Sequence, residues 1–136
     1  MKVAIVYATT TGNTGQLANA ASEGAKAAGR EVSLCTADSA DPASTLAADL
    51  VLLGSPAMGD EVLEDSMETF FSEIEGALSG KKVGLFGSYD WGDGRWMSDW
   101  ESRVTAAGAS LVGSVKAHLA PEDADVEAMK KLAAAS

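Results

Sequence analysis

Several absences limit what this chain of 136 residues can be. No apolar stretch approaches the roughly 20 residues that a membrane-spanning helix requires, so we expect no transmembrane segment. Cys35 is the only cysteine and His118 the only histidine, so neither a disulfide framework nor a metal site at ligand spacing is expected. Met1 leads directly into an apolar strand pattern instead of a signal peptide, which predicts a cytoplasmic protein.

Positive charge is also scarce, because the formal net charge is -10 at pH 7. The segment from Glu31 to Gly80 has no Lys or Arg and contains eleven Asp and Glu residues. Nucleic acids and anionic membranes both require a basic surface, so neither is expected as a partner. The acids are either a solubilising surface or an acidic face that steers basic partner proteins toward a site.

Alternating strand and helix patterns run through the chain, whose length suits a single domain over residues 1–136. Continuous apolar runs predict central strands at Val3 to Tyr7, Leu50 to Leu53 and Val83 to Phe86. Weaker patterns predict edge strands at Glu31 to Thr36 and Ser110 to Val115, with Cys35 as a small core hydrophobe. This alternation predicts an α/β fold, a five-stranded parallel sheet with helices on both faces.

The helices between these strands are predicted from their apolar faces. One stripe at helical spacing consists of Leu63, Met67, Phe70, Phe71, Ile74 and Leu78. The first helix is expected to bury Leu17 and a set of small residues that bring it close to the sheet: Ala20, Ala21, Gly24 and Ala25. Gly29 is predicted to cap that helix. Trp96 and Trp100, four positions apart on a later helix, are interpreted as packing residues.

A loop rich in hydroxyl groups follows the first strand, with the sequence TTTGNT from Thr9 to Thr14. A strand that ends in a glycine-containing loop before a helix is typical of a phosphate site. The loop is neutral, and Lys26 lies several helical turns away, so one terminal phosphate fits better than a magnesium-bound polyphosphate. The segment lacks the glycine spacing and lysine of a triphosphatase loop, and the dinucleotide fingerprint is absent.

Two further loops follow the third and fourth strands, at the sheet edge where ligands bind in such folds. The first runs from Ser55 to Glu61 and contains PAMGDE, and the second lies within FGSYDWGDGRWM from Phe86 to Met97. Each carries large side chains, Met58 in one and Tyr89 with Trp91 in the other, although connecting loops are normally small and polar.

In order and spacing, these three motifs resemble the flavodoxins of the short-chain type, over essentially the whole chain. The resemblance implies a doubly wound sheet of order 2-1-3-4-5, for which flavodoxin is itself the standard example, with FMN at the switch point. It implies that Met58 and Trp91 sandwich the isoalloxazine ring, that Tyr89 lines its outer side and that Glu61 accepts from the flavin N3–H. The implied cofactor contacts are Thr9, Thr10, Thr11, Gly12, Asn13 and Thr14; Ser55, Pro56, Ala57, Met58, Gly59, Asp60 and Glu61; and Ser88, Tyr89, Asp90, Trp91 and Gly92.

The resemblance also implies a low-potential carrier that cycles between semiquinone and hydroquinone. Gly59 suits the second position of a type II′ turn, and its carbonyl is expected to accept from the flavin N5–H after a peptide flip. Acids such as Asp60 and Asp90 near the ring would disfavour the anionic hydroquinone. Asp90 departs from relatives, which commonly have Gly there.

The resemblance therefore predicts an electron carrier without substrate turnover, a monomer whose partners are redox proteins with basic docking patches. An FMN-dependent NAD(P)H:quinone reductase-like enzyme on the same fold is the alternative, but Met58 and Trp91 would cover the ring and no insertion is present to build a nicotinamide site. A phosphorylated receiver domain does not fit, because Tyr7, Ala8, Gly54 and Ser55 stand where its acids are required.

Overall fold

The computed structural model describes residues 1–8, 12–58, 62–90, 92 and 94–134. Strands and helices alternate along these residues. The elements are β1 (Lys2–Tyr7), α1 (Asn13–Ala27), β2 (Glu31–Thr36), α2 (Pro42–Leu46), β3 (Leu50–Gly54), α3 (Asp65–Ile74), the 3-10 turn η1 (Glu75–Ala77), β4 (Lys82–Tyr89), α4 (Arg95–Ala106), β5 (Ser110–His118) and α5 (Asp123–Ala134). Within the described residues, no helix has both the length and the apolar character to cross a membrane.

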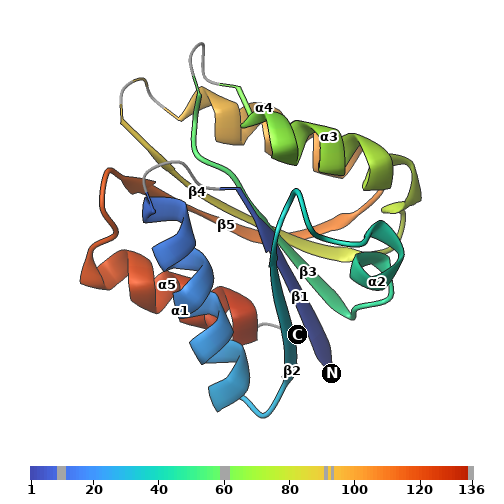
Figure 1. Cartoon of the computed structure of the whole chain (residues 1–136), viewed down its shortest axis with the longest axis horizontal. Coiled ribbons are helices and arrows are strands. Elements are labelled where there is room, and N and C mark those ends of the chain that lie inside the picture. The colour runs from blue at the N-terminus through green and yellow to red at the C-terminus, as the bar shows by residue number, and fades with distance from the viewer. Residues whose placement is uncertain (9–11, 59–61, 91, 93, 135–136) are drawn as a thin grey trace.

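The strands form one parallel sheet of order β2-β1-β3-β4-β5, which confirms the predicted topology. Helices α1 and α5 cover one face of the sheet, and α3 and α4 cover the other (Figure 1). All five residues of β3 are buried, as are the middle residues of β1. These strands are covered on both faces, which is why their sequences read as continuous apolar runs.

Two hydrophobic clusters hold the helices on the sheet. Residues of β1 and β3 alternate between them, so that Ile5 and Leu52 contact the α1 and α5 layer, while Val6 and Leu53 contact the α3 and α4 layer. The predicted stripe is buried throughout, but Leu63 and Leu78 lie beyond the two ends of α3. Trp96 and Trp100 are each 1% exposed, which confirms their packing role.

Helices α1 and α5 approach each other closely at Gly24. A Cβ atom on Gly24 would lie 2.5 Å from the Cα atom of Lys130. The expectation that Gly24 brings α1 close to the sheet is therefore wrong at this residue, because the close neighbour is the backbone of α5. Gly29 has φ of 78° and follows the helix end, and its N–H donates to the Lys26 carbonyl, as predicted for a cap.

The edge strands are less buried than the central ones. Cys35 is only half-buried and Leu34 is 37% exposed, so the expectation that Cys35 is a core residue is wrong. Nothing pairs with the outer side of β2 in the described residues, so its side chains have fewer neighbours. In β5, the pairing shifts by one residue at Gly113, where the sequence predicted an interruption.

Candidate functional site

Three segments leave the carboxyl edge of the sheet, after β1, β3 and β4, as the sequence predicted. The described residues among the predicted contacts are Gly12, Asn13, Thr14, Ser55, Pro56, Ala57, Met58, Ser88, Tyr89, Asp90 and Gly92. The remaining predicted contacts, Thr9, Thr10, Thr11, Gly59, Asp60, Glu61 and Trp91, lie outside the described residues.

The first segment turns into α1 at Gly12. This residue has φ of 93°, in the left-handed region that favours glycine, and its carbonyl accepts the first helical bond, from Gln16 N at 3.0 Å. The N–H groups of the first turn point out of the helix end without acceptors inside the helix. No acidic residue lies in that turn. This helix end is therefore suited to an anionic group.

A buried hydroxyl pair joins the first segment to the third. The Oγ1 atom of Thr14 and the Oγ atom of Ser88 share a hydrogen bond of 3.0 Å. The Ser88 carbonyl accepts from Ala57 N at 2.9 Å, which brings in the second segment. Ser88 therefore connects the end of the first segment, at Thr14, to the second segment, at Ala57.

Ser55 fixes the start of the second segment. It is fully buried, and its N–H donates to the Phe86 carbonyl at 3.1 Å. Its hydroxyl donates to the Pro56 carbonyl and accepts from Glu64 N, each at 2.9 Å. The hydrogen bond from Glu64 N to the Ser55 hydroxyl therefore joins the two ends of the second segment. Farther out, Met58 and Val62 form an antiparallel bridge with bonds of 2.9 and 3.1 Å.

The third segment is supported by the end of β5. Tyr89 packs on His118, with ring centroids 5.1 Å apart, and the His118 Nε2 atom lies 2.9 Å from the Asp90 carbonyl oxygen. The Tyr89 carbonyl accepts from Leu119 N at 2.8 Å. Leu119 has φ of 62°, which is rare for a leucine and marks a tightly determined backbone. His118, which the sequence gave no binding role, therefore holds the backbone of Asp90.

Trp96 is a residue of the site that the sequence interpretation missed. Its Nε1–H donates to the Ser55 carbonyl at 3.2 Å, and its ring packs on Tyr89 with centroids 5.6 Å apart. One side chain from α4 therefore contacts both the second and the third segments. Helical spacing predicted its burial, but spacing carries no information about a hydrogen bond to a residue 41 positions away.

Close approach of β3 and β4 places these segments side by side. A Cβ atom on Gly87 would lie 2.0 Å from the Ser55 carbonyl oxygen. A Cβ atom on Gly54 would lie 2.2 Å from the Phe86 ring. Glycine is required at both positions because the neighbouring atoms already fill the space.

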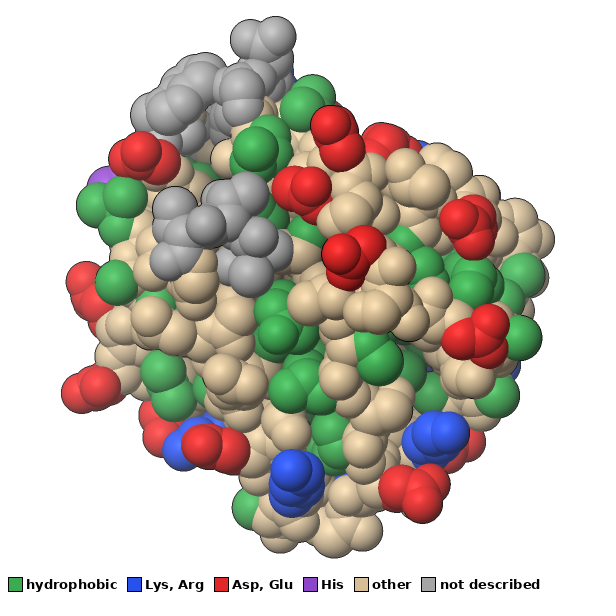
Figure 2. All heavy atoms as spheres, in the orientation of Figure 1, with side chains coloured by type: hydrophobic (Ala, Val, Ile, Leu, Met, Phe, Trp, Pro, Cys, Tyr) green, Lys and Arg blue, Asp and Glu red, His purple; other side chains and the backbone are tan. Residues whose placement is uncertain are grey.

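Acidic side chains are spread over the face shown in Figure 2, in both its upper and lower halves, whereas the prominent Lys and Arg side chains lie in the lower half. The positive charge of Arg103 is neutralised, because its guanidinium donates to Glu68 at 2.7 and 2.9 Å and to Glu75 at 3.1 and 3.2 Å. The hydrogen bonds from Arg103 hold the pKa of Glu68 below its usual value.

The arrangement suits a cofactor with one phosphate and a flat ring. The N-terminus of α1 and a buried hydroxyl pair lie at the first segment, while Met58 and Tyr89, both half-buried, belong to the other two segments. A thioether and an aromatic ring are suitable surfaces for a planar apolar group.

Comparison with known proteins gives one consistent match. The sequence profile of the flavodoxin family matches residues 5–131. The chain is 44% identical to the flavodoxin of Megasphaera elsdenii over 123 residues, 90% of each chain, and 45% identical to that of Clostridium beijerinckii over 109 residues, 79% of each. The solution structure of two-electron reduced Megasphaera elsdenii flavodoxin superposes with a TM-score of 0.90 at 41% identity and covers 97% of this chain and 98% of that one.

Proposed function

Because the chain belongs to the flavodoxin family, it is an FMN-binding electron-transfer protein, and we propose that residues 1–136 form one domain that holds FMN between its three edge segments. The observation that carries this placement is Ser88, which hydrogen-bonds both Thr14 and Ala57. When bound, FMN supplies the two one-electron steps of the carrier. The protein residues bind it, orient it and set its potentials.

We assign the phosphate of FMN to the start of α1. Gly12 orients the first turn, and the amides of Asn13 and Thr14 lie where no helical carbonyl can accept from them. The hydroxyl groups of Thr9, Thr10 and Thr11 are proposed to bind the same phosphate. A neutral set of donors distinguishes the site from a polyphosphate loop, which depends on lysine and a metal ion.

We assign the flavin ring to the second and third segments. Met58 and Trp91 are proposed to cover its two faces, with Tyr89 on the outer side and Glu61 at N3. The remaining proposed contacts are Ser55, Pro56, Ala57, Gly59, Asp60, Asp90 and Gly92. The Met58–Val62 bridge supports this assignment, because it fixes the positions of the two described residues that flank residues 59–61 in the sequence. The Gly59 carbonyl is proposed as the acceptor for a proton at the flavin N5.

Acidic residues are proposed to lower the second one-electron potential. A carboxylate roughly 12 Å from the ring, at an effective dielectric constant of about 40, destabilises an added negative charge by about 0.7 kcal/mol, or about 30 mV for one electron. Asp90 is exposed at the third segment, and salt will screen part of its effect. Several such charges together would make the reduced protein a strong reductant.

We further propose that the protein has no substrate turnover of its own and acts as a monomer. The family transfers electrons to redox partners, and the scarcity of positive charge from Glu31 to Gly80 favours partners with basic docking patches. A cytoplasmic location is part of the same proposal. It is supported by a single cysteine, which excludes an intramolecular disulfide, a feature common outside the cytoplasm.

Anaerobic stepwise reduction of the FMN-loaded protein tests the carrier assignment. We expect a long-wavelength absorbance band that rises and then bleaches, with two separate one-electron potentials. Bleaching in a single step would contradict the proposal and favour the quinone reductase-like alternative. Asp90→Asn is expected to raise the second potential by up to about 30 mV, while Glu31→Gln, at the opposite edge of the sheet, serves as the charge-matched control.

A further inference from the structure

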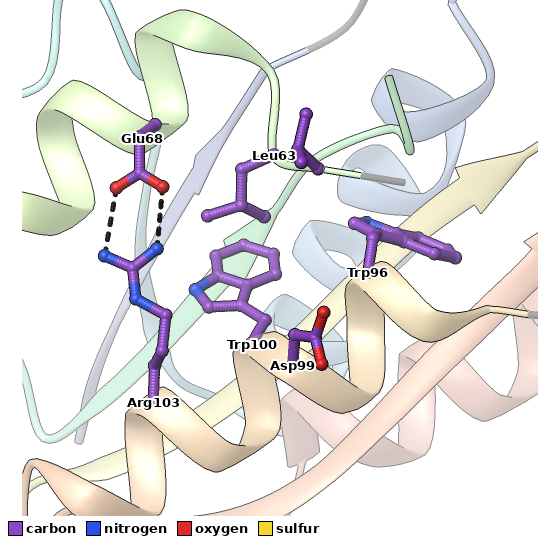
Figure 3. Close-up of a pocket in the computed structure, with 7 residues that line it drawn as sticks. Leu63, Glu68, Trp96, Asp99, Trp100 and Arg103 are labelled. Carbon is purple, nitrogen blue, oxygen red and sulfur yellow. Dashed lines mark hydrogen bonds and ion pairs between the residues drawn. The ribbon is translucent and has the colours of Figure 1, made fainter. Parts of the chain in front are cut away.

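A hollow lies between α3 and α4 (Figure 3), and Val62, which pairs with Met58, is among the residues that line it. Its volume is about 100 Å³. Leu63, Trp96 and Trp100, all buried, form its apolar lining, and Val62, 55% exposed, lies at its rim. None of the proposed flavin contacts that the structure describes lines this hollow, and Trp96, which does line it, has its N–H bonded to Ser55.

The indole of Trp100 leaves one hydrogen bond unmade. Trp100 is 1% exposed, and its Nε1–H has no acceptor among the described residues. In Figure 3 this nitrogen lies on the edge of the ring that faces Arg103 and Glu68. More than nine-tenths of buried polar groups in native proteins are satisfied, so an unpaired indole N–H beside a hollow indicates a missing acceptor.

Charges around the hollow restrict the chemistry of that acceptor. Arg103 is already bonded to Glu68 and Glu75, so its charge is neutralised, and the exposed carboxylate of Asp99 also lines the hollow. The carboxylates of Glu68 and Asp99 would therefore repel an anion. Among the described residues that line the hollow, no cation outside an ion pair is present to attract one. An ammonium ion has no lone pair for the indole N–H. A neutral group that accepts one hydrogen bond and donates another satisfies both conditions.

We propose that this hollow is a binding site for a small neutral group that is both acceptor and donor, such as a primary amide or water. Its oxygen accepts from Trp100 Nε1, and its own N–H or O–H donates to Glu68 or Asp99. The volume is sufficient for a few water molecules or one amide-sized group. The site is separate from the proposed FMN contacts, and its occupancy does not depend on the redox chemistry.

Acetamide and acetate test the proposal as a matched pair of nearly equal shape. Each is titrated into the FMN-loaded, ¹⁵N-labelled protein, and the indole cross-peaks, assigned with Trp→Phe variants, are followed. We expect acetamide to shift the Trp100 signal saturably, with half-saturation on the order of 10–100 mM. Acetate should produce no saturable shift. The Trp96 signal, whose N–H is bonded to Ser55, serves as the internal control.

The water form of the proposal has its own measurement. If acetamide does not bind, we expect a cross-relaxation signal between the Trp100 indole proton and a long-lived water molecule. Absence of both signals would overturn the proposal, and equal binding of acetate and acetamide would overturn the charge argument. Trp100→Phe should abolish the acetamide response at the Val62 amide. If that variant does not fold, the comparison on the native chain decides.

Discussion

The indole N–H of Trp96 and the main-chain carbonyl of Ser55 are joined by a buried hydrogen bond of 3.2 Å. Ser55 begins the second segment, and Trp96 lies in the first turn of α4, which follows the third. This single bond therefore couples the position of α4 to the loop proposed to carry the flavin contact Met58. Trp96 is a positioning residue in this account, because it reaches the cofactor only through Ser55 and Tyr89.

Trp96→Phe should lower the free energy of unfolding by about 1–3 kcal/mol beyond the cost of lost volume, because a buried carbonyl loses its donor. Affinity for FMN should fall by about tenfold when about 1.4 kcal/mol of that energy is lost from the second segment. Trp100→Phe is the matched control, since that residue is equally buried and its N–H has no acceptor among the described residues. Equal loss of FMN affinity in both variants, measured by quenching of flavin fluorescence, would contradict the positioning role.

Gly87→Ala should destabilise the protein strongly. The added Cβ would lie 2.0 Å from the Ser55 carbonyl oxygen, so β3 and β4 must separate locally at the edge where the segments begin. Overpacking of this kind costs about 1–3 kcal/mol or more. Gly76→Ala is the control, because a Cβ there meets nothing within 4 Å. Urea denaturation of the two apoproteins measures the difference, and similar midpoints would show that the strands adjust freely.

The hydroxyl pair of Thr14 and Ser88 permits a double-mutant cycle. Thr14→Val and Ser88→Ala should each lower the free energy of unfolding by about 1–3 kcal/mol. Each substitution removes one hydroxyl and leaves the other, still buried, without this hydrogen bond. The double variant should cost less than the sum by about 0.5–1.5 kcal/mol. Unfolding free energies and FMN dissociation constants are measured for all four proteins. Additive costs would mean that the two hydroxyls do not depend on each other.

The pairing of Glu68 with Arg103 predicts that the free energy of unfolding falls at acid pH. Its hydrogen bonds with Arg103 lower its pKa in the folded state below the usual value of 4.5. The stabilisation is therefore fully present above about that pH and is lost as the pH falls toward the folded pKa, where the unfolded chain takes up the proton first. Because the Glu68 side chain is 47% exposed, the effect is screened by solvent and salt.

Glu68→Gln should accordingly flatten the fall in unfolding free energy between neutral pH and pH values below 4.5. Glu73→Gln, an exposed acid on the same helix, is the control. Guanidinium would screen the ion pair, so urea denaturation at a series of pH values is the appropriate measurement. An unchanged slope in Glu68→Gln would mean that the Arg103 contact contributes nothing to acid stability.

Much of the fold could be predicted because periodicity reports burial. The central strands were placed to within a few residues, and β3 is buried at every position, as its unbroken apolar run indicated. The largest difference is at β4 and β5, which continue to Tyr89 and His118. These extensions pair Gly87 with Lys116, Ser88 with Ala117 and Tyr89 with His118, residues that form no apolar run, so hydrophobic patterning carries no signal for them.

The sequence pointed to three segments at the carboxyl edge of the sheet but not to the hydrogen bonds that support them. Loop composition identified the segments that contain Thr14, Ser55 and Ser88, whereas the bonds from Trp96 and His118 required the structure. Both join residues from different elements, and a sequence pattern reports only neighbours along one element. The expectation that Cys35 is a core residue was wrong for a related reason, since β2 is an edge strand and Cys35 is only half-buried.

The contact of Gly24 with Lys130 has a consequence for the order of synthesis. During synthesis α1 is made well before α5, yet the two helices lie against each other, with Gly24 close to the backbone of Lys130. One flank of α1 therefore stays exposed until α5 has been made. Such long-range pairing slows folding and exposes apolar surface in the meantime. A nascent chain that stops before α5 should thus require protection by a chaperone.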